Sequence, residues 1–250
     1  MGDAFFHYME IVFILLPFLA LALGVISSIY FLVWWWRHRH ERHARAYIHW
    51  SLSLFLFYWF QVPAILIGLG RAIIVTDFNL FFALTFPITF LALMFIYLGV
   101  VRMSGFKISK SKKTVLAIWF VAATAFFAYQ FIWHKGIIQT YILPLGGNIV
   151  FYIPMRILIV LTVFRLFFQK DIKKTLLFFG SLGIIGESVL GLARNVFIIV
   201  NVLKYPPQAW YTVIAGSKFF FVTQTMSILF LVFGFYFLHR AYHKVRYSTK

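Results

Sequence analysis

The sequence predicts an all-α fold: a polytopic integral membrane bundle of seven transmembrane helices that forms a single domain over residues 1–250. Composition is the first reason, because 63% of the 250 residues are hydrophobic and only 12% are charged. Apolar surface on that scale has to be solvated by lipid, which excludes an ordinary soluble domain. The second reason is spacing, since short connections join the apolar runs and leave no room for a soluble domain.

Each predicted helix is an apolar segment close to or above the length of about 20 residues that crosses the hydrocarbon core. The segments cover residues 9–36, 46–70, 76–101, 114–134, 145–168, 175–203 and 210–238. The first segment lacks the basic stretch that begins a secretion signal, and its apolar run is too long for a cleaved one. We therefore expect it to be retained as the first span.

Positive charge predicts the orientation of the bundle. Residues 37–45, 102–113, 165–174 and 240–250 hold 17 Lys and Arg, whereas the connections on the other side hold only Arg71, Lys135 and Lys204. Short loops rich in Lys and Arg remain in the cytoplasm. The N-terminus is thus expected outside and the C-terminus in the cytoplasm, in a multi-pass protein of the cell membrane.

The net charge of +17 would indicate nucleic acid in a soluble protein, but here topology accounts for it and we expect no nucleic acid partner. The expected partners are the lipid bilayer, anionic lipid headgroups at the cytoplasmic face and, for a receptor-like bundle, a cytoplasmic protein. His38, His40 and His43 could form a metal tract, although the neighbouring arginines repel a cation and favour lipid headgroups instead. Cysteine is absent, which excludes disulfides and thiol catalysis.

Residues 175–203 carry the pattern that predicts where the functional site lies. With a period of 3.6 residues, one side of this helix holds small and polar residues, and the rest of its surface is aliphatic or aromatic. The residues on that side are Gly180, Gly183, Glu187, Gly191, Arg194 and Asn201. Such a stripe packs against other helices, and ionised side chains at bilayer depth usually mark function.

Two further spans are expected to contribute to the same site. Asn148, Tyr152 and Arg156 recur every fourth residue along the fifth segment, and Lys218 lies about nine residues into the last segment with Gln224 after it. The orientation places Glu187 at the centre of the membrane and the three cations outward of it. The candidate ligand-binding residues are therefore Glu187, Arg156, Arg194, Lys218, Tyr152, Asn148 and Gln224.

One carboxylate cannot neutralise the three cations in a medium of low dielectric constant. Arg194 could extend to the membrane surface, Lys218 could lose its proton, or an anion could enter from outside. A structural alternative is that Glu187 pairs with one cation and only holds helices together. The sequence leaves these possibilities open.

We interpret the site as a buried, charged pocket on the outer side that binds a small anionic or amphipathic molecule, as a sensor or as a transporter. The sequence identifies no cofactor, no metal site and no catalytic residue. One alternative is an intramembrane lipid-modifying enzyme, in which arginines clamp a phosphate and Glu187 acts as the base. No paired carboxylates or hydrolase motif supports catalysis, so we expect a protein that is not an enzyme.

Retinal binding is a further alternative, as a photoreceptor or pump. Seven helices, an external N-terminus and a lysine in the last helix are similar to the rhodopsins, and Glu187 would then be the counter-ion of a Lys218 Schiff base. Microbial rhodopsins carry an aspartate four residues before their lysine, where this chain has Ile214. Their Trp-x-x-Tyr-Pro pattern is also missing from the sixth segment. Shared topology alone does not carry function between proteins.

The predicted topology can be tested because the chain contains no cysteine. Cysteines introduced by Ser111→Cys and Ser248→Cys should resist a membrane-impermeant thiol reagent in intact cells, since both lie on the cation-rich side. Lys135→Cys, on the opposite side, is the matched control and should be labelled. The reverse pattern of labelling would show that the predicted orientation is wrong.

Overall fold

The computed structural model describes residues 2–41, 44–57, 75–106, 109–133, 141–168, 174–206 and 217–247, and all regular elements in these ranges are helices. The helices are α1 (Gly2–Arg37), α2 (Arg45–Phe57), α4 (Val75–Ser104), α5 (Lys110–Trp133), α6 (Ile142–Gly146), the π-helix η2 (Gly147–Tyr152), α7 (Ile153–Leu166), α8 (Lys174–Lys204) and α10 (Lys218–Tyr247). The predicted all-α class is therefore confirmed.

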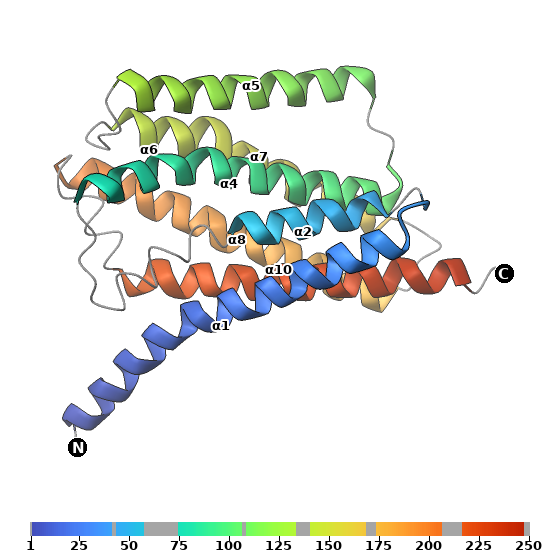
Figure 1. Ribbon diagram of the computed structural model, residues 1–250, viewed down its shortest axis with the longest axis horizontal. Helices are drawn as coiled ribbons and strands as arrows, with labels where there is room; N and C mark the ends of the chain where they lie inside the picture. Colours follow the sequence, from blue (N-terminus) through green and yellow to red (C-terminus); the bar gives the residue numbers. More distant parts are fainter. Residues whose placement is uncertain are drawn as a thin grey trace.

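The helices run side by side as a bundle (Figure 1). The most extensive packing joins α8 to α10, and α2 packs between α1 and α4. α7 lies against both α8 and α4, while α5 lies at the edge of the bundle and packs mainly on α4. α8 is thus enclosed between α7 and α10, which allows its polar stripe to face protein on two sides.

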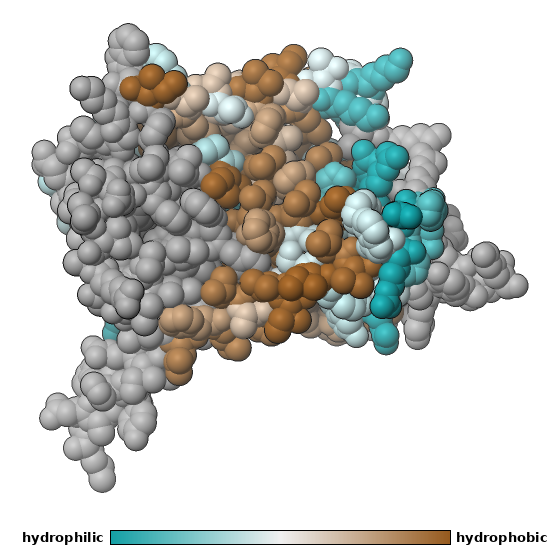
Figure 2. Space-filling model, in the orientation of Figure 1, coloured by the Kyte–Doolittle hydropathy of each residue, from teal (hydrophilic) through white to brown (hydrophobic). Residues whose placement is uncertain are grey.

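Six stretches of helix are long and apolar enough to cross a membrane, so the chain is a multi-span integral membrane protein. The described part of the second predicted span is α2, and residues 58–74 lie outside the described residues. Among the described residues on the face that Figure 2 shows, hydrophilic side chains gather at one end, next to a largely hydrophobic middle. Exposed cations at this cation-rich end include Arg37, Arg39, Lys110, Lys112, Arg165 and Lys174.

The last helix differs from its predicted range. Its described part begins at Lys218 and continues to Tyr247, whereas the hydropathy pattern predicts 210–238; residues 207–216 lie outside the described residues. Lys218 is exposed at the first residue of α10 rather than about nine residues inside a span. At a helix end the ammonium group avoids the cost of burial at bilayer depth.

The helix of the fifth predicted span contains a π turn. The backbone N–H of Ile153 donates to the carbonyl of Asn148, five residues earlier, and the Asn148 side chain donates to the carbonyl of Pro144 at 2.6 Å. Pro154 follows directly and has no N–H to donate. Because a π turn inserts an extra residue, the face of α7 is rotated relative to the face of α6.

Glycines bring α8 and α10 into close backbone contact. A Cβ atom placed on Gly183 would lie 2.6 Å from the Cα atom of Gly234, and one on Gly180 would lie 2.8 Å from the backbone nitrogen of Leu238. No side chain fits at such distances, so the small residues permit the approach of the two helices. The prediction that the Gly183 face touches other helices rather than lipid is confirmed.

Gly183→Leu should lower the stability of the purified protein, because the added side chain meets the backbone of α10. Overpacking of this kind costs about 1–3 kcal/mol or more, which lowers the thermal unfolding temperature by several degrees. Val189→Leu is the matched control, since Val189 on the same helix is 54% exposed. Equal unfolding temperatures for the two variants would show that the interface tolerates a side chain.

Candidate functional site

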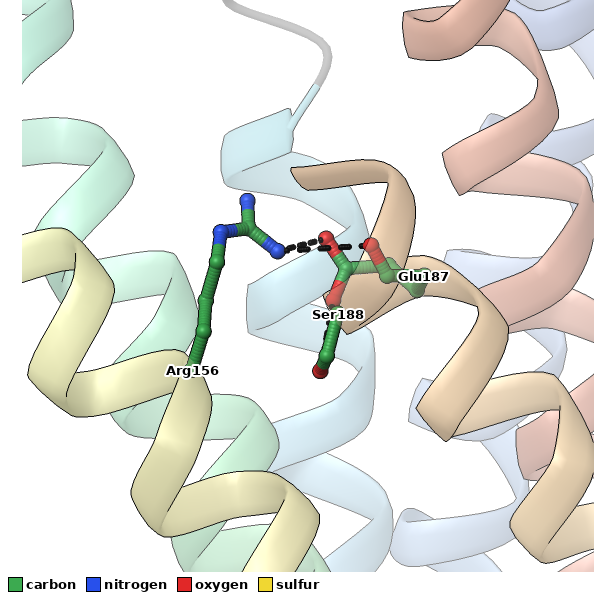
Figure 3. A network of polar contacts seen from close by, with 3 residues as sticks. All are labelled: Arg156, Glu187 and Ser188. Atoms are coloured by element: carbon green, nitrogen blue, oxygen red, sulfur yellow. Dashed lines mark hydrogen bonds and ion pairs between the residues drawn. The ribbon is translucent and has the colours of Figure 1, made fainter. Parts of the chain in front are cut away.

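A buried ion pair joins α7 to α8. Arg156 Nη1 lies 2.6 Å from Glu187 Oε1 and donates a longer bond of 3.4 Å to the Glu187 backbone carbonyl. The side chains are 3% and 0% exposed. The Ser188 hydroxyl donates to the second carboxylate oxygen, Oε2, at 3.3 Å (Figure 3). Both oxygens of Glu187 are therefore engaged, one by a guanidinium and one by a hydroxyl.

Gly191 provides the space for this pair. A Cβ atom on Gly191 would lie 1.9 Å from both Cζ and Nη1 of Arg156, so the guanidinium lies directly against the backbone of α8. Gly191 lies between Glu187 and Arg194 on the small and polar side of α8 and leaves space there. That space is filled by Arg156 from the neighbouring helix, which explains why a residue without a side chain is required.

Arg194 is the second buried cation. Its side chain lies two helical turns beyond Glu187 and is close enough to Arg156 and Glu187 for electrostatic interaction. The residue is 7% exposed and forms no ion pair or hydrogen bond with any residue that the structure describes. Two guanidinium groups therefore lie near one carboxylate. The cluster of Arg156, Glu187 and Arg194 carries one uncompensated positive charge.

Buried polar atoms without a partner occur on α8 and on the helices packed against it. Ring contact between Phe197 and Phe219 at 5.0 Å, together with the Gly183–Gly234 contact, places Gln224 of α10 at the level of residues 191–195 of α8. Several buried atoms lack a hydrogen-bond partner within the described structure, namely Arg156 Nε, Asn195 Nδ2, Asn148 Oδ1, and Oε1 and Nε2 of Gln224. Buried polar groups are normally paired, so such a concentration requires an explanation.

Two of the predicted site residues lie elsewhere. Tyr152 donates its hydroxyl hydrogen to the backbone carbonyl of Phe86 at 2.7 Å and stacks on the Phe86 ring, which ties the π-helix η2 to α4. Arg156, four residues later in α7, contacts α8 instead, and α7 packs against both of these neighbouring helices. Lys218 lies at the exposed start of α10, so it does not join the buried charges.

The structure also identifies two residues that the sequence pattern missed. Ser188 binds the Glu187 carboxylate, and Asn195, which is 5% exposed, follows directly after Arg194. Each lies at the edge of the predicted stripe, one residue beyond a charged position. A wider stripe, about 140° across, would have included both residues.

The histidine tract after α1 is only partly described. His38 stacks on Trp34 at 4.5 Å between ring centroids, and its Nδ1 lies 3.0 Å from the Trp34 carbonyl oxygen. His43 lies outside the described residues. Within the described ranges, no group of three His, Asp or Glu side chains is placed to hold a metal ion.

Comparisons with protein-family models, curated proteins and solved structures found no match for this chain.

The ion pair can be tested by a double-mutant cycle. Glu187→Gln leaves the Arg156 charge buried without its partner and should destabilise the protein by about 3–5 kcal/mol. Adding Arg156→Met removes that orphaned charge, so the double variant should be more stable than the sum of the single effects predicts. Thermal unfolding of the three purified variants measures the coupling.

Lys218→Met is the control for this cycle, because Lys218 lies apart from Glu187 at the start of α10. Its effect should add to that of Glu187→Gln without coupling. Coupling to Lys218 and strict additivity with Arg156 would overturn the assignment of the pair.

Proposed function

We propose that this protein spans the cell membrane and binds a small anionic or amphipathic molecule at Arg194, as a sensor or a transporter of that molecule. The observation that carries the proposal is the uncompensated charge of Arg194 beside the Arg156–Glu187 pair. Glu187 does not supply the missing charge, because its two oxygens already accept bonds from Arg156 and Ser188.

A monoanion is the ligand that this arrangement suits. An unpaired ion at bilayer depth costs several kcal/mol, and one negative charge from a ligand removes that cost. Asn195 Nδ2, Gln224 Nε2 and Arg156 Nε offer N–H donors for the ligand oxygens. Charge-assisted hydrogen bonds of this type favour a carboxylate or a similar oxyanion, which can be the polar head of an amphipathic molecule.

The positive-inside rule assigns the cation-rich end to the cytoplasm. α8 begins at that end with Lys174, so Arg194 lies farther from the cytoplasm than Glu187 by about 10.5 Å along the helix axis. We therefore propose that the ligand enters from outside. The Arg156–Glu187 pair lies on the cytoplasmic side of Arg194, so transport requires this pair to separate, whereas sensing does not.

Thermal stabilisation of the purified protein by anions tests the proposal. A panel of sodium salts of small monoanions, including acetate, benzoate and a medium-chain fatty acid, should contain at least one that raises the unfolding temperature. A ligand at 100 times its dissociation constant adds about 2.7 kcal/mol. Arg194→Gln should abolish the shift, whereas Glu187→Gln should strengthen binding because it increases the net positive charge.

Arg165→Gln is the matched control, since Arg165 is an exposed cation at the cytoplasmic end of α7 and should leave the shift unchanged. An equal loss with Arg165→Gln would indicate unspecific attraction of anions. Uptake of the stabilising anion by proteoliposomes then separates the two roles, because only a transporter carries the labelled anion inside.

A further inference from the structure

A second site candidate lies between α1 and α10, apart from the buried charges. A groove of about 450 Å³ opens between α1 and α10 on the lateral surface of the bundle. Its lining residues are Ile26, Ser27, Tyr30 and Phe31 of α1 and Leu229, Val232, Phe233 and Tyr236 of α10. Seven of these eight residues have apolar or phenolic side chains, the eighth is Ser27, and none of the eight is charged. Ile26 and Tyr236 are 66% and 43% exposed, so the groove faces the bilayer.

The groove changes in character along its length. Its end nearest the cytoplasm is formed by Tyr30 and Tyr236, and Arg240 follows one helical turn later. Arg240 Cζ lies 5.9 Å from the centroid of the Tyr236 ring, and Tyr30 lies within electrostatic reach of both Tyr236 and Arg240. Arg240 is exposed and forms no ion pair with a described residue. Two hydroxyls and a guanidinium thus converge where the apolar groove ends.

The dimensions match one leaflet of a membrane. From Leu229 to Arg240, α10 rises about 16 Å at 1.5 Å per residue. Half of the hydrocarbon core is about 15 Å thick. The Trp34 ring lies 4.7 Å from the ring of His239, the residue before Arg240, as expected for an aromatic residue at the membrane interface. The groove therefore extends from the centre of the bilayer to the headgroups at the cation-rich end.

The chemistry of the groove favours a lipid as its occupant. Its walls are uncharged, which suits an acyl chain. Its cytoplasmic end holds the hydroxyls of Tyr30 and Tyr236 beside the Arg240 guanidinium, which suits an anionic headgroup.

We propose that this groove binds one anionic phospholipid of the cytoplasmic leaflet. An acyl chain lies between α1 and α10, and the phosphate accepts hydrogen bonds from the Arg240 guanidinium and from the hydroxyls of Tyr30 and Tyr236. The charge of Arg240 and the absence of an acidic side chain in the groove favour a lipid with net negative charge over a zwitterionic one.

Native mass spectrometry of the full-length protein in detergent tests this site. The probes are phosphatidylglycerol and phosphatidylcholine with identical acyl chains. The wild-type protein should retain phosphatidylglycerol in preference to phosphatidylcholine. Because Arg240 is exposed, Arg240→Gln should fold normally, and it should lower the affinity for phosphatidylglycerol about tenfold, the loss expected for a charged hydrogen bond.

Two further variants complete the test. Arg165→Gln, an exposed arginine on the same end of the bundle, should leave the preference unchanged. Leu229→Trp fills the apolar part of the groove and should reduce retention of both lipids. Tyr236→Phe keeps the groove but removes one hydrogen bond to the phosphate that both lipids carry, so it should leave the preference for phosphatidylglycerol in place. Equal retention of the two lipids by the wild type, or an equal loss with Arg165→Gln and Arg240→Gln, would overturn the proposal.

Discussion

The buried ion pair between Arg156 and Glu187 constrains the rest of the structure. The Arg156 guanidinium lies against the Glu187 carboxylate, and it reaches that position only because Gly191 has no side chain. The pair also fixes the charge of the site, since both carboxylate oxygens are engaged and cannot turn toward Arg194. The excess positive charge therefore follows from the geometry of the pair and from the number of buried cations.

The close contact of α8 with α10 is a second condition for the site. Gly180 and Gly183 let the two backbones meet, which brings Gln224 to the level of Arg194. α7 and α10 thus lie on different sides of α8, one supplying a cation and the other an uncharged polar side chain. The lipid groove uses a different face of α10, toward α1, so the two proposed sites depend on separate surfaces of that helix.

Much of the fold could be predicted because hydropathy and helical period are properties of the sequence itself. Hydropathy predicts the six apolar spans that the structure contains, and the helical period predicts the packed face of α8 at Gly183. The partner of Glu187 could not be predicted, because it depends on the π turn at Gly147–Tyr152, which rotates Arg156 relative to the start of its helix. The exposed position of Lys218 depends on where α10 begins, and hydropathy averaged over a window blurs such ends.

The position of Gly191 also bears on how the chain is inserted into the membrane. A charged side chain at the centre of a helix costs about 2.5–3.5 kcal/mol during insertion, so α7 and α8 are each penalised when they enter singly. Only residues 167–173 separate these helices, and an ion pair formed early removes both charges from lipid together. We therefore expect the two helices to leave the translocon as one hairpin, so that the partnership of Arg156, Glu187 and Gly191 acts in biogenesis before the bundle is complete.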